Sequence, residues 1–365
     1  MGNETSIPRY AKKSILKSHT QPISGVAFSP CNTKLATTSL DSSCIIWNIS
    51  DLNNVTILMT LTEHKDSVRC VCFSPDGTRM VTGSNDNTAI IWFMENNTNN
   101  QGQVAFNLLG HKESVSCVCY SPDNKRIATG SEDKSIILWS NFGKQVLKLS
   151  GHSMAISSVC FSHDGNLLAT GGWDHSVIIY EVNPDASYNN FGRELLKLNS
   201  GFPLTSVSFN NDSKRLATGS EDKNVVIWDT DFDNKKESNN NTNNNNNTNK
   251  NLEKKNTITT YLGDKIGIYS SHAYSVTCVA YSRDGLKLAT VSEDKTAIIW
   301  NVDPLITSDE SHQRKLILKD HHNGVTTVDF NINGKLMATG SNDNTVIIYE
   351  EKPPKENETG NKLIN

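Results

Sequence analysis

The sequence predicts an all-β fold, namely a closed seven-bladed β-propeller with four antiparallel strands in each blade. Three features of the 365-residue chain lead to this prediction. An aspartate followed six residues later by an aromatic residue occurs seven times, each of these aspartates has a threonine four residues before it, and six have a histidine 22 residues before them. A unit of about 40 residues built from short strands needs neighbours to bury its faces, so seven such units indicate a ring of stacked sheets.

The four recurring positions define seven sets of residues. The histidines are His19, His64, His111, His152, His272 and His321, and Ser200 stands at this position in the fifth repeat. The threonines are Thr37, Thr82, Thr129, Thr170, Thr218, Thr290 and Thr339. The aspartates with their aromatic partners are Asp41 with Trp47, Asp86 with Trp92, Asp133 with Trp139, Asp174 with Tyr180, Asp222 with Trp228, Asp294 with Trp300, and Asp343 with Tyr349.

These four residue types can form one chain of hydrogen bonds. An indole N–H only donates, a threonine hydroxyl donates and accepts, and an imidazole can donate to a carboxylate. Because a buried aspartate must be hydrogen-bonded, we expect each set to fasten its own blade, at about 1 kcal/mol per bond. A catalytic triad occurs once in a protein, whereas this set recurs in nearly every repeat, so no catalytic residue is predicted.

The elements of each repeat follow in a fixed order. In the second repeat a first strand at 68–73 precedes the Asp76-Gly77 dipeptide, which is typical of a tight hairpin turn, and a third strand spans 89–92. The second strand is illustrated by residues 126–130 of the third repeat. The third strands are continuous apolar runs, as expected for sheets covered on both faces.

These residues resemble the WD40 repeat family, whose signature is a glycine-histidine pair, a turn aspartate and a closing tryptophan-aspartate. The resemblance covers roughly residues 13–350. It implies that each repeat supplies the outer strand of one blade and three inner strands of the next, so that an N-terminal strand at 13–17 completes the last blade beside residues 346–349. Departures from the signature at Tyr180, Ser200 and Tyr349 predict locally weaker blades.

We therefore expect a propeller over residues 13–350, preceded by a flexible arm at 1–12 and followed by a flexible tail at 351–365. One interval between successive turn aspartates is 72 residues long, while the others run from 41 to 49. The extra length is an Asn-rich insertion at about 231–260, whose composition predicts a disordered loop. The resemblance places this loop on the bottom face of the ring.

Composition limits the classes of function. The 35 basic and 39 acidic residues give a net charge of −4, so nucleic acid is not an expected partner. No apolar run reaches the length of a transmembrane helix, and the N-terminus lacks the apolar segment of a secretory signal. The cysteines form no C-x-x-C pair, and Cys70 with Cys72 and Cys117 with Cys119 are predicted to be buried. We expect a cytoplasmic protein, with a nuclear location left open, that holds no metal or cofactor.

The resemblance implies that partner proteins dock on the top face, through two residues of each repeat. The residues before the turn aspartates are Leu40, Asn85, Glu132, Trp173, Glu221, Glu293 and Asn342. The residues five positions after the histidine place are Ser24, Arg69, Ser116, Ser157, Thr205, Thr277 and Thr326. Trp173 lies outside the repeated aromatic position that the other five tryptophans occupy, so we expect it to face solvent.

These residues lead to a functional hypothesis. A scaffold or adaptor, acting as a monomeric subunit of a larger complex, would bind a basic peptide or loop through Glu132, Glu221 and Glu293, with Trp173 as apolar anchor. Further contacts are assigned to Arg69, Met154, Phe202 and Tyr274. The alternative is that the three glutamates are ordinary solvated charges.

Two other classes of function compete with this hypothesis. A G-protein β-like signalling subunit would resemble its relatives in having an N-terminal heptad helix, and only about a dozen residues precede the first expected strand. An enzymatic propeller would need a unique polar set in the central channel, and the sequence shows none.

The first six residues, Met1 to Ser6, match the M-G-x-x-x-[ST] pattern of N-myristoylation. Gly2 is therefore a candidate for lipidation, and a fortuitous match is the alternative. A single acyl chain would give only weak and reversible membrane binding.

Overall fold

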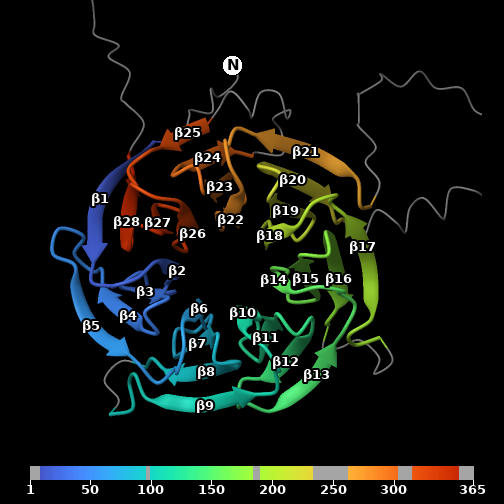
Figure 1. Ribbon diagram of the computed structural model, residues 1–365, viewed down its shortest axis with the longest axis horizontal. Coiled ribbons are helices and arrows are strands. Elements are labelled where there is room, and N and C mark those ends of the chain that lie inside the picture. The colour runs from blue at the N-terminus through green and yellow to red at the C-terminus, as the bar shows by residue number, and fades with distance from the viewer. Residues whose placement is uncertain (1–8, 96–98, 184–189, 233–261, 303–314, 353–365) are drawn as a thin grey trace, which may run out of the picture.

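The computed structural model describes residues 9–95, 99–183, 190–232, 262–302 and 315–352. Over these residues the chain forms 28 strands in seven four-stranded antiparallel sheets. The sheets stand around a central channel like the blades of a propeller (Figure 1). The fold is therefore the all-β ring of seven blades that the repeats predict. Each blade is numbered below after the repeat that supplies its three inner strands.

Every blade has the same four strands from the channel outward. The first strands are β2 (Ile23–Phe28), β6 (Val68–Phe73), β10 (Val115–Tyr120), β14 (Ile156–Phe161), β18 (Leu204–Phe209), β22 (Val276–Tyr281) and β26 (Val325–Phe330). The second strands are β3 (Lys34–Ser39), β7 (Arg79–Ser84), β11 (Arg126–Ser131), β15 (Leu167–Gly172), β19 (Arg215–Ser220), β23 (Lys287–Ser292) and β27 (Leu336–Ser341). The third strands are β4 (Cys44–Asn48), β8 (Thr88–Phe93), β12 (Ile136–Ser140), β16 (Ser176–Glu181), β20 (Asn224–Asp229), β24 (Ala297–Asn301) and β28 (Thr345–Glu351). The outer strands are β5 (Thr56–Leu61), β9 (Val104–Leu109), β13 (Gln145–Leu149), β17 (Glu194–Asn199), β21 (Lys265–Ser270), β25 (Lys315–Leu318) and β1 (Tyr10–Lys17).

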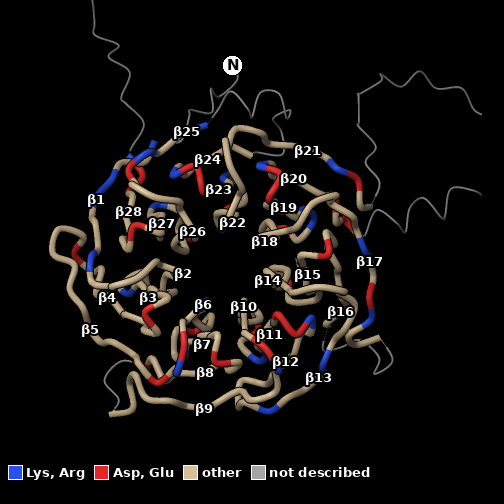
Figure 2. Tube along the Cα trace, viewed as in Figure 1, with Lys and Arg blue, Asp and Glu red and all other residues tan. Residues whose placement is uncertain are grey.

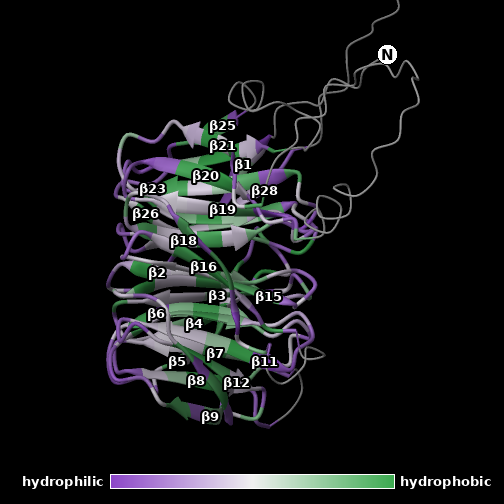
Figure 3. Ribbon diagram, turned by 90° about the vertical axis from the view of Figure 1, so that its right-hand side faces the viewer, coloured by the Kyte–Doolittle hydropathy of each residue, from purple (hydrophilic) through white to green (hydrophobic). Residues whose placement is uncertain are grey.

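Burial follows the position of a strand in its blade. The second strand β11 is buried at all six positions and the third strand β12 at four of five, because both faces of a blade are covered by its neighbours. The outer strand β13 buries only Leu149 fully. Hydrophobic residues accordingly concentrate in the strands, whereas the loops on both faces of the ring are largely hydrophilic (Figure 3).

The last blade contains both ends of the described chain. Strand β1 pairs antiparallel with β28, from Tyr10 opposite Glu351 to Lys17 opposite Thr345. The backbone N–H of Lys352 also donates to the carbonyl oxygen of Arg9 at 2.6 Å. In Figure 1 the blue first strand lies directly beside the red last strand.

Strand β1 begins earlier than the sequence indicates. Residues 10–12 were expected to belong to a flexible arm, but they pair with β28 in the structure. The reason is Tyr10, whose buried ring packs 6.2 Å from that of Phe330 and whose hydroxyl donates to the carbonyl oxygen of Gly334. The tail boundary shifts less, because β28 ends at Glu351.

Tight turns join the first strand of each blade to the second. Gly77 and Gly165 have φ angles of 70° and 75°, in the left-handed region that glycine adopts without strain. Asn32 and Asn124 take the same conformation in their own blades, which asparagine tolerates better than most residues. The turns therefore share one geometry although their sequences differ.

Several expectations concern residues outside the described ranges. They are the candidate lipidation site at Gly2, nearly all of the insertion at 231–260, and the tail beyond residue 352. Over the ranges that the structure does describe, no helix is long and apolar enough to cross a membrane.

Candidate partner-binding face

The top face of the ring is formed by two loops from each repeat. One joins an outer strand to the first strand of the following blade and carries the histidine position. The other joins the second strand to the third and carries the turn aspartate. The repeated polar residues therefore lie just beneath this face, where they hold its loops in place.

In the second blade the four repeated side chains form a continuous chain of hydrogen bonds. The indole N–H of Trp92 donates to Thr82 Oγ1 at 2.8 Å, Thr82 Oγ1 lies 2.8 Å from His64 Nε2, and His64 Nδ1 lies 2.9 Å from Asp86 Oδ2. A neutral imidazole that carries its proton on Nδ1 satisfies every group, because Nε2 then accepts from threonine and Nδ1 donates to the carboxylate. The same histidine contacts recur in the blades of His19, His111, His152, His272 and His321.

The other four tryptophans of the repeated position also donate to the threonine of their own blade. Each indole N–H lies 2.9 Å from the hydroxyl oxygen: Trp47 to Thr37, Trp139 to Thr129, Trp228 to Thr218 and Trp300 to Thr290. In the first, third and sixth blades the chain is complete, because the histidine joins the threonine to the aspartate.

The fifth blade does not form the predicted chain of four. Trp228 donates to Thr218, but the histidine position is Ser200, so no imidazole continues the chain from Thr218 to Asp222. The threonine hydroxyl keeps a contact with the carbonyl oxygen of Val226 at 3.3 Å, which Thr37, Thr129 and Thr170 also make with the third strand of their own blades. The network of this blade is therefore divided, with the indole and the threonine on one side and the carboxylate on the other.

The surroundings of the networks that contain a histidine favour a neutral imidazole and an ionised aspartate. Burial lowers the pKa of His111, His152 and His321 and keeps these rings neutral. Burial raises the pKa of Asp343, but hydrogen bonds from Thr345, the His322 backbone and His321 outweigh it and hold that pKa at about 2. The turn carboxylate is thus ionised, and it anchors the loop that bears it.

The fourth blade departs from this pattern in another way. Tyr180 was grouped with the tryptophans, but its hydroxyl donates to the carbonyl oxygen of Ser150 at 3.3 Å and makes no hydrogen bond with Thr170. The tyrosine hydroxyl stands at the far end of its ring, farther from the backbone than an indole N–H, so it reaches the loop at Ser150 and passes Thr170. Thr170 keeps its contact with His152 Nε2 at 2.8 Å. The chain in this blade therefore has three members.

The hydroxyl groups five positions after the histidine place are engaged within the ring. In five blades this hydroxyl donates to the first-strand carbonyl of the next blade: Ser24 to Val68, Ser116 to Ile156, Thr205 to Val276, Thr277 to Val325 and Thr326 to Ile23. The sequence assigned these positions to partner docking, and the repeat pattern carried no sign of their role between blades. Arg69 differs, because it is exposed at the same position.

The exposed apolar side chains of the top face gather on three consecutive blades. Trp173 is 50% exposed and Phe202 is 52% exposed, and Met154 and Tyr274 are exposed as well. Trp173 and Met154 belong to loops of the fourth blade, Phe202 leads into the fifth, and Tyr274 leads into the sixth. Large exposed apolar side chains that cluster in this way are typical of interaction sites.

Charged groups accompany these apolar side chains. Glu132, Glu221 and Glu293 are all exposed in the turns of the third, fifth and sixth blades. The Lys223 ammonium lies 5.8 Å from the centre of the Tyr274 ring, within range of a cation–π contact. Viewed down the ring, acidic and basic residues occur in every blade, and neither sign dominates a sector (Figure 2).

Between the fourth and fifth blades, the loop 199–203 bridges two turns. The backbone N–H and the hydroxyl of Ser200 both donate to the His175 carbonyl oxygen in the turn of the fourth blade. The carbonyl oxygen of Pro203 accepts from Glu221 N–H and from Ser220 Oγ in the turn of the fifth. Phe202 is therefore held between the turn that bears Trp173 and the turn that bears Glu221.

The turn of the fourth blade also has an unusual composition. Gly172 stands where the other six blades have serine, and a Cβ atom there would lie 2.6 Å from His152 Nδ1. Only glycine fits at this distance without a shift of the imidazole. The residue before Trp173 is thus a glycine that the polar network of the fourth blade requires. Trp173 itself is the one aromatic residue at this turn position, where the other blades carry polar or aliphatic residues.

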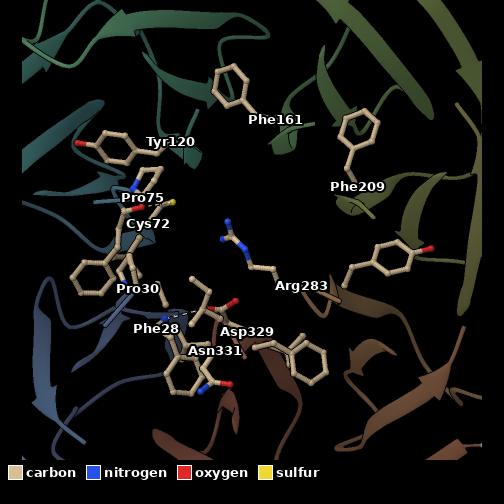
Figure 4. Close-up of a pocket in the computed structure, with 18 of the residues that line it drawn as sticks. Phe28, Pro30, Cys72, Pro75, Tyr120, Phe161, Phe209, Arg283, Asp329 and Asn331 are labelled. Carbon is tan, nitrogen blue, oxygen red and sulfur yellow. Dashed lines mark hydrogen bonds between the residues drawn. The ribbon is translucent and has the colours of Figure 1, made fainter. Parts of the chain in front are cut away.

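The central channel contains a cavity of about 550 Å³ lined by the first strands and their turns (Figure 4). It holds charged side chains that the sequence did not single out: Arg283 points into the opening, and Asp329 Oδ2 accepts from Phe28 N–H at 2.9 Å. Burial raises the pKa of Asp329 to about 7. The sequence does distinguish Asp329, because it is the one carboxylate at this position of the first strands. The equivalent residues of the other blades are small and uncharged: Ala27, Cys72, Cys119, Cys160, Ser208 and Ala280.

Of the four cysteines that were predicted to be buried, Cys117 is buried, whereas Cys70, Cys72 and Cys119 are only partly buried between blades. Cys70 and Cys72 both pack against the cluster formed by the second and third blades, so they share one face of β6. Burial raises the pKa of the Cys72 and Cys117 thiols to about 12. All eight cysteines are free, and Cys31 is exposed in a turn.

A comparison with known protein families agrees with this geometry. The family model described as WD domain, G-beta repeat matches the chain seven times, at residues 11–48, 55–92, 102–140, 143–181, 193–229, 263–301 and 312–350. Each match spans an outer strand and the three strands that follow it. No curated protein matches the chain.

Proposed function

Since the chain belongs to the family of WD domain, G-beta repeat proteins, we propose that it is a scaffold or adaptor that binds partner proteins on its top face. Propellers of this family typically serve as interaction platforms, and a rigid ring that presents loops suits such a role. A fold alone does not specify a function, so the proposal depends on the site.

The observation that carries the proposal is the cluster of exposed apolar residues where the repeat pattern is broken. Most exposed positions of the top face are polar, whereas Trp173, Phe202, Met154 and Tyr274 expose large apolar surfaces on three neighbouring blades. A group of large exposed apolar side chains marks an interaction site, and tryptophan is among the residues most enriched at binding hot spots. We therefore place the centre of the interface at the fourth and fifth blades.

The acidic turns indicate the charge of the partner. Glu221 directly borders the apolar cluster, and Glu132 and Glu293 flank it on the adjoining blades. Complementary charge steers association and selects partners more than it adds affinity. The proposed partner segment is accordingly basic, with an apolar side chain that packs on Trp173.

Affinity purification with matched variants tests this proposal. The double variant Trp173→Ala, Glu221→Lys removes the anchor and reverses the neighbouring charge, so the partners captured by the unaltered protein should be lost. The control is Phe142→Ala, which truncates another exposed aromatic residue, in the β12–β13 loop on the opposite face. Partners that the double variant retains, or that Phe142→Ala loses equally, would contradict the proposal.

A further inference from the structure

One of the seven turn carboxylates lacks the partners that the other six have. In the second blade, the Asp86 carboxylate accepts from four donors: His64 Nδ1, the backbone N–H of Lys65, and both the N–H and the hydroxyl of Thr88. The other five blades with a histidine repeat the imidazole contact. In the fifth blade the histidine position is Ser200, so no imidazole reaches Asp222.

The remaining donors to Asp222 come from a single residue. Its Oδ1 accepts from Asn224 N–H at 3.0 Å, and its Oδ2 accepts from Asn224 Nδ2 at 3.1 Å. Across the described part of the chain, no other group donates a hydrogen bond to this carboxylate. The backbone N–H of Gly201, which follows the histidine position, donates instead to the side chain of Asn199. Two of the usual donors to the turn carboxylate, the imidazole and the neighbouring loop N–H, are thus missing in this blade.

The loop that lacks the imidazole is held away from Asp222 by other contacts. Ser200 Oγ donates to the carbonyl oxygens of His175 and Phe202, at 2.8 Å and 2.6 Å. The serine hydroxyl therefore bonds to the turn of the fourth blade and to its own loop. Its short side chain does not extend to Asp222, where the imidazole of the other blades donates. Exposed Phe202 accepts from Ser200 through its carbonyl oxygen, exposed Trp173 lies two residues before His175, and Glu221 stands next to Asp222 in the chain.

We propose that the junction of the fourth and fifth blades binds an arginine side chain of a partner protein, whose guanidinium donates to Asp222 where an imidazole donates in the other six blades. This inference rests on the proposed function and names the partner chemistry at its centre. The junction site consists of Trp173, Ser200, Phe202, Glu221 and Asp222.

Two features of the site favour arginine over lysine. The planar guanidinium presents paired N–H donors that match a carboxylate, whereas an ammonium acts as a point charge. Guanidinium also stacks on aromatic faces, which the exposed rings of Phe202 and Trp173 provide. The two acidic groups, Glu221 and Asp222, supply the opposite charge.

The test uses the full chain and small probes. N-acetyl-L-arginine amide carries the guanidinium, and N-acetyl-L-citrulline amide is its neutral counterpart of the same shape. Trp173 is the exposed tryptophan, while the other five are buried, so its fluorescence reports on the junction site. We expect a saturable change with the arginine probe, with Kd on the order of 1 mM for a ligand of this size, and none with citrulline.

Two variants test the role of the Asp222 carboxylate, one by removing its charge and the other by giving it an internal hydrogen-bond donor. Asp222→Asn removes the charge and should weaken binding about tenfold or more. Ser200→His supplies the missing imidazole, so it should abolish binding while raising the melting temperature. The matched control is Glu113→Gln, which removes an exposed top-face charge at the third blade and should leave the Kd unchanged.

The outcomes separate this inference from the proposed function. Equal binding of citrulline and arginine, or unchanged binding in both Asp222→Asn and Ser200→His, would overturn the inference. Partner capture that depends on Trp173 but not on Ser200→His would overturn the inference while the proposed function stands. Partner capture that is insensitive to every junction variant would overturn both.

Discussion

The threonine of the second strand is the residue on which each polar network converges. In the second blade Thr82 links two buried groups, Trp92 Nε1 and His64 Nε2. In the fourth blade Thr170 links only His152, because Tyr180 donates elsewhere. The chain therefore contains both a threonine with two side-chain partners, Thr82, and a threonine with one, Thr170, and the two can be compared directly.

Replacing each threonine by valine should show this difference. Valine keeps the shape and removes the hydroxyl, so Thr82→Val leaves two buried polar groups without partners and should cost about 2–4 kcal/mol. Thr170→Val leaves one and should cost about 1–2 kcal/mol. Urea unfolding of both variants measures the two costs. Equal costs would mean that the indole bond contributes nothing to stability.

The raised pKa of Asp329 leads us to expect that the free energy of unfolding falls as the pH rises. Burial raises its pKa to about 7 in the folded protein, compared with about 3.9 for an unfolded aspartate. The folded state therefore binds the proton more tightly, and the stabilisation present below pH 4 is lost as the pH rises through about 7. Because the group faces the channel and solvent screens its charge, we expect a loss of about 2 kcal/mol between these limits.

The variant Asp329→Asn tests this dependence. An amide oxygen can still accept from Phe28 N–H but does not titrate in this range. The variant should match the unaltered protein at pH 4 and be more stable at pH 8. Thermal unfolding across this range gives the comparison, and parallel curves for the two proteins would contradict the assignment.

The turn aspartates have the opposite dependence. Hydrogen bonds outweigh burial and hold the pKa of Asp133 and Asp343 at about 2. Their stabilisation is present above about pH 4 and is lost as the pH falls toward 2. The same thermal unfolding series, extended to pH 2, should show a steep loss of stability that Asp343→Asn makes shallower.

At the scale of elements, basic residues at the start of the second strands tie neighbouring blades together. Lys34, Arg79 and Arg126 each reach the residue that directly follows the third strand in the next blade: Met94, Asn141 and Val182. Arg126 also donates to the carbonyl oxygen of Gly165 and pairs with Asp123 at 3.2 Å. These contacts lie near the bottom face, opposite the hydroxyl bonds of the top.

Arg126→Leu should weaken the bond between the third and fourth blades. Leucine stands at the same position in the fourth blade, as Leu167, so the change is tolerated sterically. The loss of several charge-assisted hydrogen bonds from a buried guanidinium should cost about 2–3 kcal/mol in urea unfolding. Lys125→Ala, a change at the adjacent exposed residue, is the control and should stay within about 0.5 kcal/mol.

The sequence predicts the strands well because each is marked several times by fixed spacing. The expected strand at 68–73 coincides with β6, and Trp173 is exposed as its place outside the repeated aromatic position indicates. Features that depend on the distance between blades were missed. The contact from Ser24 to Val68 spans 44 residues, and the partner of Tyr180 depends on the reach of its ring. Neither distance is encoded in the spacing of a repeat.

At the scale of the whole molecule, the ring depends on the seam between its two ends. Leu16 of β1 is 5% exposed and packs with side chains of the first and last blades, while its neighbour Ile15 is 46% exposed. The two residues therefore differ in burial but share one strand. They allow the seam to be tested without shortening the chain.

Leu16→Asp should destabilise the entire ring. A charge buried at this position, together with the lost apolar contacts, should cost about 4 kcal/mol or more, and blades that stack only on neighbours should unfold together. Ile15→Asp should change stability by less than about 1 kcal/mol. Thermal unfolding followed by circular dichroism distinguishes the two. A small local effect of Leu16→Asp would show that the seam is dispensable.

The pairing of β1 with β28 also sets an order of events during synthesis. The first strand leaves the ribosome more than 300 residues before its partner. Until the last strand emerges, the nascent chain carries an unpaired strand edge and an uncovered face of the first blade, both of which favour aggregation. The early strand thus stays unpaired while more than 300 further residues are translated, a period in which chaperones are the natural protection for its exposed edge.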